Sequence, residues 1–127
     1  MPSTGIPECA TTKLADAAIS EYYVVKRGTD DSHVATSAVA AEACLGIANE
    51  AAATGQQVTV NLLGYSFAIA SAAIAAGGKI MSSGDGRVAP ATAAAGVNAH
   101  VLGIAVGKAT AAGDKLLVLL VPSVMQG

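Results

Sequence analysis

The residues able to do acid–base or metal chemistry are few, and they are scattered along the chain. His33 follows Asp30 and Asp31 closely, and an imidazole with two carboxylates can bind a metal ion, but the three match no defined ligand pattern. The other histidine, His100, stands apart from them. We therefore interpret the segment around His33 as a solvated turn, and we predict no metal site.

A glycine-rich segment at residues 82–86, with the sequence SSGDG, resembles a phosphate-binding loop in composition alone. Such a loop needs a lysine and a helix directly after its glycines, and neither follows here. A tight turn is therefore predicted. No serine, cysteine or histidine stands in a nucleophile motif, and no carboxylate pair is placed for general acid–base catalysis. The sequence predicts no catalytic residue, no cofactor and no enzyme.

The two cysteines, Cys9 and Cys44, match neither a metal-binding nor a redox spacing. We interpret them as free thiols in a reducing compartment, although a disulfide between them stays open.

The charge balance argues against nucleic acid and anionic membranes as partners. Nine acidic residues outnumber seven basic ones, which gives a net charge of −2 without a basic patch. Four aromatic side chains could stack on bases, but without surrounding basic residues they are better interpreted as core or interface anchors. They are Tyr22, Tyr23, Tyr65 and Phe67.

A membrane-spanning helix is considered because no charged residue lies between Glu50 and Lys79, and residues 58–76 are long enough for one. Asn61 and the strand-like alternation of residues 58–63 argue against it, and the first residues lack the pattern of a signal peptide. We predict no membrane segment.

A four-residue motif occurs twice in the chain and indicates an internal repeat. The sequence LGIA occurs at residues 45–48 and 102–105, and each copy precedes a turn with glycine and an apolar strand. Residues 26–35 also align with residues 80–89. We interpret the halves, residues 17–63 and 71–121, as an internal duplication of a small β unit. We expect the halves to share one core in a single domain, residues 17–127, because 127 residues suit one domain.

The last strand carries the clearest pattern. Leu116, Val118 and Leu120 alternate along one face, and the opposite face is apolar as well. A strand that is apolar on both faces is covered on both. The second face, formed by Leu117, Leu119 and Val121, is therefore predicted to contact another subunit or a partner surface. Oligomerisation would supplement a core with few aromatic residues, which make up 3% of the chain.

Residues 1–16 lack any periodicity, and Pro2 and Pro7 favour extended backbone. We predict an extended N-terminal arm, which is either disordered or lies along another surface.

The combined order of these motifs over residues 17–121 resembles the capsid decoration, or cement, proteins of tailed bacteriophages. The motifs are YVVK, an Asp-containing turn, LGIA, VTVNLLG, GGKI, GDGRV, a second LGIA, AAGD and LLVLL. The resemblance implies a small β-barrel of the tulip type on the outer surface of the expanded head. Relatives commonly stand as homotrimers between capsomers and stabilise the shell against internal DNA pressure, and the family has no catalytic residues to carry over.

The resemblance further implies the phage major capsid protein as the partner. The location implied is the outer capsid surface of the virion, after synthesis in the host cytoplasm. The shell-binding arm of the family would correspond here to Pro2, Ser3, Thr4, Gly5, Ile6 and Pro7. An alternative is a β-rich oligomeric adhesin or fibre-type module that recognises a cell-surface ligand. The sequence leaves open which residues contact the shell, whether the trimer forms before docking, the lattice size and any further host-binding role.

Overall fold

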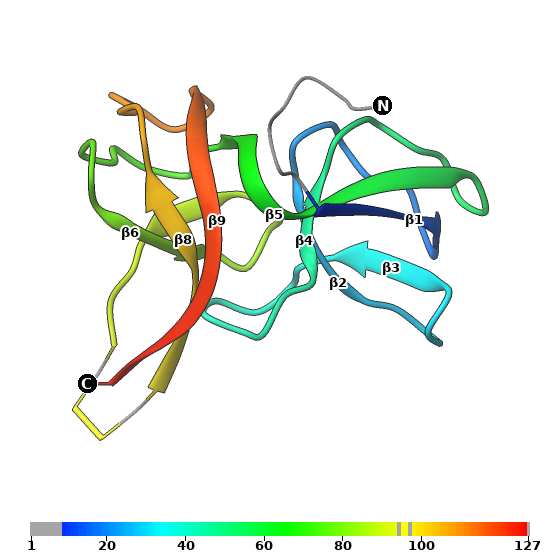
Figure 1. The fold of residues 1–127 in the computed structure, drawn as a ribbon, viewed down its shortest axis with the longest axis horizontal. Helices are drawn as coiled ribbons and strands as arrows, with labels where there is room; N and C mark the ends of the chain where they lie inside the picture. The colour runs from blue at the N-terminus through cyan, green and yellow to red at the C-terminus, as the bar shows by residue number, and fades with distance from the viewer. Residues whose placement is uncertain (1–8, 94, 97, 127) are drawn as a thin grey trace.

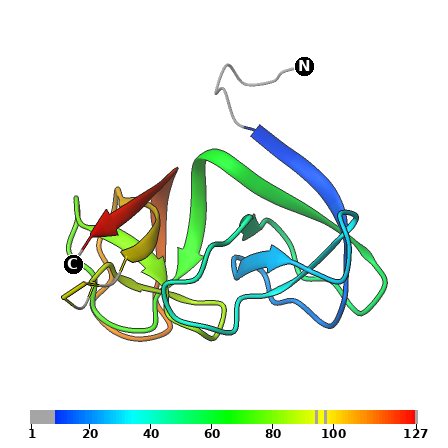
Figure 2. The same ribbon diagram turned by 90° about the horizontal axis from the view of Figure 1, so that it is seen from below.

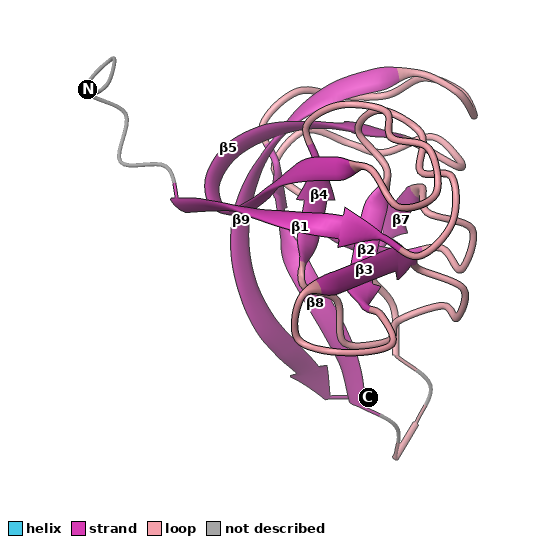
Figure 3. Cartoon of the chain, turned by 90° about the vertical axis from the view of Figure 1, so that its right-hand side faces the viewer, coloured by secondary structure: helices cyan, strands magenta, loops and turns pink. Residues whose placement is uncertain are grey.

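The computed structural model describes residues 9–93, 95–96 and 98–126. Within them the chain forms strands and loops and no helix (Figure 3). The mainly β class predicted from the sequence is confirmed. The strands are β1 (Cys9–Ala15), β2 (Val24–Arg27), β3 (His33–Thr36), β4 (Gly46–Ala48), β5 (Gln57–Ile69), β6 (Lys79–Ser82), β7 (Val88–Pro90), β8 (Asn98–Ala105) and β9 (Lys115–Gln126).

A small barrel is present, as predicted, but its five strands come from the first half of the chain and not from residues 17–127 as a whole. Its strand order is β1-β3-β2-β4-β5, and β1 closes the barrel by pairing antiparallel with β5. This pairing runs from Cys9 opposite Leu63 to Leu14 opposite Gln57. The pairing of β1 with β3 is parallel.

The second half continues from the far end of β5, with the order β5-β9-β8-β6-β7. Residues 64–69 of β5 pair antiparallel with residues 115–120 of β9. A parallel bridge between Ala70 and Val88 brings β7 back to the end of β5. The two halves therefore lie side by side and share β5, which arches from one to the other (Figures 1 and 2). Gly64 lies within this strand.

The strand pairings of the first half recur in the second. The antiparallel pairs β2–β3, β2–β4 and β4–β5 have counterparts in β6–β7, β6–β8 and β8–β9. The bridge between Ile19 and Ala52 likewise has a counterpart between Ile74 and Ala109. The duplication itself stays our interpretation of this pattern.

Two adjoining clusters of buried side chains replace the single shared core that we expected. The first comprises Ala15, Ile19, Val25, Val34, Ala48, Ala52, Val58 and Val60. The second comprises Val24, Ile47, Ala68, Ala70, Ile74, Ile80, Val88, Leu102, Ala105, Ala109, Leu116, Val118 and Leu120. Strands β2 and β4 separate the clusters, because successive side chains of a strand point to opposite faces.

The boundary predicted for the N-terminal arm is wrong. Residues 9–15 form β1 between β3 and β5, and Ala15 is buried. Thr11 and Thr12 are β-branched and suit a strand. The predicted shell-binding residues, Pro2, Ser3, Thr4, Gly5, Ile6 and Pro7, lie outside the described residues.

Candidate functional site

The histidine turn is held by its own hydrogen bonds. His33 Nδ1 lies 2.7 Å from Asp30 Oδ1, and Ser32 N–H donates to the same oxygen at 2.8 Å. The contact with Asp30 raises the pKa of His33, and the same contact lowers the pKa of Asp30. No group of three His, Cys, Asp or Glu side chains in the described part of the chain could hold a metal ion.

The glycine-rich segment is a turn whose polar groups satisfy one another. Asp85 accepts hydrogen bonds from Ser83 Oγ at 2.5 Å and from Arg87 N–H at 3.1 Å, and its second oxygen lies 2.6 Å from Arg87 Nη2. The bonds from Arg87, followed by the bond from Ser83, lower the pKa of Asp85 to about 2. The carboxylate side chain leaves this turn poorly suited to a phosphate.

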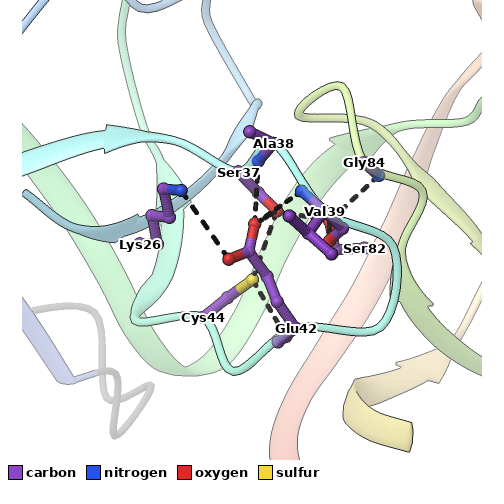
Figure 4. Close-up of polar contacts among 8 residues, drawn as sticks. All are labelled: Lys26, Ser37, Ala38, Val39, Glu42, Cys44, Ser82 and Gly84. Atoms are coloured by element: carbon purple, nitrogen blue, oxygen red, sulfur yellow. Dashed lines mark hydrogen bonds and ion pairs between the residues drawn. The ribbon is translucent and has the colours of Figure 1, made fainter.

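A buried polar latch ties the connection between β3 and β4 to β6 of the other half (Figure 4). Glu42 Oε2 accepts hydrogen bonds at 2.8 Å from Ser37 Oγ and from the N–H groups of Ala38 and Val39. Ser37 Oγ also lies 2.5 Å from Ser82 Oγ, and both serines are buried. The latch thus spans residues 37–42 and Ser82.

The electrostatics of this latch suit a structural role. Burial alone would raise the pKa of Glu42, but the hydrogen bonds from Val39, Ser37 and Ala38, with Lys26 Nζ at 3.7 Å, hold it below its ordinary value. The neighbouring Cys44 thiol has a raised pKa, mainly because it is buried. A thiol with a raised pKa is a weak nucleophile at neutral pH.

An exposed apolar face covers the outer side of β5, β8 and β9. Leu117 and Leu119 are half-buried there, and Val121 is 48% exposed. Tyr65 pairs with Leu119, and Leu119 pairs on its other side with Ile104. Paired residues share one side of a sheet, so these side chains form a row across three strands. We call this surface the outer apolar face; it comprises Leu63, Tyr65, Phe67, Ile104, Val106, Leu117, Leu119 and Val121.

One end of the outer apolar face carries an aromatic and cationic contact. The rings of Phe67 and Tyr22 are tilted, with centroids 5.5 Å apart, and Lys115 Nζ lies 4.7 Å from the centre of the Phe67 ring. A hollow of about 230 Å³ adjoins this end. It is lined by Asn49, Asn61, Tyr65, Ser66, Phe67 and Leu117.

The sequence predicted three members of the outer apolar face, Leu117, Leu119 and Val121. It also predicted that Tyr65 and Phe67 are core or interface residues, without locating them on this face. It missed Leu63, Ile104 and Val106 as members of the same surface. The apolar residues at alternate positions along β5 were a usable signal, but the pairing that brings three strands together depends on contacts distant in sequence.

Comparison with known proteins gives a family for the chain. The sequence pattern of one family, described as phage cement protein, matches residues 11–120. The chain belongs to the phage cement protein family. The resemblance found in the sequence is thereby confirmed, and membership associates this cement-family chain with the phage capsid as a structural protein. A search of curated proteins found no match.

The fold of this cement-family chain is similar to a solved structure described as the head fiber gp8.5 N base in bacteriophage phi29. The TM-score is 0.68 at 21% sequence identity, over 90% of this chain and 94% of that one. At this identity the likeness is one of fold. Within the residues that the structure describes, no helix has the length and apolar character needed to cross a membrane.

Proposed function

We propose that this cement-family protein binds the outer surface of the expanded phage head between capsomers and stabilises the shell. The observation that carries the proposal is the family match over residues 11–120. The outer apolar face supports it, because a contiguous apolar surface on a small domain marks a contact with another macromolecule. The partner would be the major capsid protein, the protein would act as a homotrimer, and no catalytic step is involved.

The mechanism would be multivalent clamping. A single copy of a domain this small offers each capsomer a modest contact, on the order of 800 Å² or less. A trimer that contacts several capsomers at once gains from the high effective concentration of its remaining contacts. Binding of this kind adds free energy only to the lattice that presents the complete site, so it favours the expanded shell.

The N-terminal segment would add a further contact. Strand β1 begins at Cys9, and Cys9 pairs with Leu63 of the outer apolar face. An extended segment can add to the edge of a neighbouring sheet through main-chain hydrogen bonds. We assign this role to Pro2, Ser3, Thr4, Gly5, Ile6 and Pro7.

Co-sedimentation with expanded, undecorated heads of the source phage tests the proposal. We expect saturable binding at three copies for each three-fold site, and a protein that lacks residues 2–7 should bind more weakly while keeping β1. A folded protein that stays in the supernatant at all concentrations would refute the proposal. Unchanged binding after the deletion would refute the role of residues 2–7 alone.

An adhesin or fibre-type module is the second candidate. The hollow beside Phe67 favours it, because aromatic rings and the side-chain amides of Asn49 and Asn61 suit a neutral sugar. Binding in a glycan screen, with no binding to expanded heads, would favour this candidate over the first.

A further inference from the structure

We propose that the outer apolar face is the contact between copies of this chain, and that it is already covered before the protein meets a shell. The inference deepens the homotrimer of the proposed function, and it is tested without any shell. The proposed function alone is compatible with either a copy of the chain or the capsid as the partner of this face. The inference names a second copy of the chain as that partner.

The first support is the continuity of the face. Its members on β5, β8 and β9 lie in register, since Tyr65 pairs with Leu119 and Leu119 pairs with Ile104. Val106 follows β8 directly, and its N–H donates to the carbonyl of Leu117 at 2.9 Å. Six of the eight side chains are between 39% and 48% exposed. Single exposed apolar residues are ordinary on a protein surface, but a contiguous set across three strands indicates an interaction surface.

The second support is the size of the face. Three strands about 4.8 Å apart, with about five residues along each, span roughly 14 Å by 17 Å, or roughly 240 Å² in projection. A stable contact buries about 800 Å² on each partner, of which the apolar centre is a part. The face therefore has the extent of an interface centre, and its polar neighbours Asn49, Asn61 and Lys115 would lie at the rim.

The third support is charge. None of the eight side chains of the outer apolar face carries a charge at neutral pH. Two copies of such a face can meet without opposing like charges, and a centre depleted of charged residues is typical of protein interfaces. The nearby Lys115 ammonium lies over the Phe67 ring at the end of the face rather than within it.

The hazard of leaving the face uncovered favours a copy of the chain over the shell. A face reserved for a different macromolecule would stand in water as an aggregation hazard until that partner is met. A second copy is present from synthesis onward and removes that hazard at once. Covering the face also supplements two small cores that contain many alanines.

A matched pair of substitutions on β9 tests the inference. Val121→Glu places a charge on the outer apolar face. Val124→Glu places the same charge on a valine of the same strand that is somewhat more exposed and is not a member of the face. We expect the unaltered protein to sediment, without any shell, at about three times the 12.3 kDa mass of the chain. Val121→Glu should weaken association at least tenfold, and Val124→Glu should leave it unchanged.

Tyr65→Glu serves as a second variant on the neighbouring strand, and circular dichroism verifies that each variant is folded. A monomeric unaltered protein at all concentrations would overturn the inference and leave the face to the shell. An oligomer that survives both Val121→Glu and Tyr65→Glu in folded form would overturn it as well. An oligomer that fails to bind expanded heads would leave this inference standing and refute the proposed function instead.

Discussion

Replacement of Gly103 by alanine should destabilise the protein strongly. Gly103 lies on β8 opposite Leu120, next to the register shift between β8 and β9. An added Cβ would overlap with the carbonyl oxygen of Leu119 and lie only 2.9 Å from the backbone nitrogen of Val121. These atoms belong to the main chain of β9, so no side-chain rotation can relieve the contact.

The cost follows from the movement that this overlap demands. Strands β8 and β9 would have to separate by about an ångström at the place where Leu120 and Val118 enter the second core. Overpacking in a core typically costs about 1–3 kcal/mol, and weakened ladder hydrogen bonds cost about 1 kcal/mol each, so we expect a loss of about 4 kcal/mol. That is a large part of the roughly 5–15 kcal/mol that stabilises a domain.

Urea unfolding, followed by circular dichroism at one fixed chain concentration, measures this loss. Gly107→Ala is the matched control, because its Cβ would meet nothing closer than 3.7 Å. The control should lie within about 0.5 kcal/mol of the unaltered protein. If Gly103→Ala unfolded at the same urea concentration as Gly107→Ala, the reasoning from the backbone contact would be wrong.

Three further predictions concern the polar groups. Glu42→Gln should lower the free energy of unfolding by about 1–2 kcal/mol at pH 7. Because the fold lowers the pKa of Glu42 from 4.5, the stabilisation by its carboxylate is present above pH 4.5 and should shrink below it. A difference in urea stability between the variant and the unaltered protein that widens at pH 3 would contradict this. An NMR titration should give the Asp85 carboxyl a midpoint at its pKa of about 2. The stabilisation of the fold by this carboxylate is therefore present above pH 3.8 and is lost as the pH falls through 2. A midpoint near 3.8 would show that the contact with Arg87 is absent. In a Cys9→Ser background, Cys44 should react with Ellman's reagent at pH 8 much more slowly in the folded protein than in urea, and equal rates would mean that the thiol is not buried.

The sequence predicted those parts of the fold that depend on neighbouring residues. Alternating apolar residues located β5 and β9, and the glycines of the two LGIA phrases marked corresponding positions in the halves. The structure supplies a reason for these glycines: a Cβ at Gly46 would overlap with the carbonyl oxygen of Asn61, as one at Gly103 would with that of Leu119. The glycine of each LGIA motif is thus explained by the close approach of a neighbouring strand's backbone.

Features that depend on distant contacts were predicted less well. The alignment of the halves set Lys26 against Ile80, whereas the strand pairings make Met81 its counterpart. Residues 9–15 read as part of an arm because their pattern is weak on its own, and they form a strand because β5 and β3 both offer an edge to them. The latch between Ser37 and Ser82 likewise joins residues that no local pattern relates.

The outer apolar face was predicted only in part, because it too depends on contacts between residues distant in sequence. The apolar second side of β9 could be read from alternation along one strand. Its continuation onto Tyr65 and Ile104 required the register of three strands, which only the folded chain provides. The assignment of this face to a second copy then rests on its extent, its lack of charge and the aggregation hazard of leaving it uncovered.

Heating DNA-filled, undecorated heads of the source phage with and without the protein tests the central claim of capsid cementing most directly. The measured quantity is the temperature at which the heads release their DNA, followed with a dye that the intact shell excludes. We predict a higher release temperature at saturating protein, and a smaller rise with Val121→Glu. If the protein bound to the heads and the release temperature stayed the same, it would be a capsid-binding protein without a cementing function.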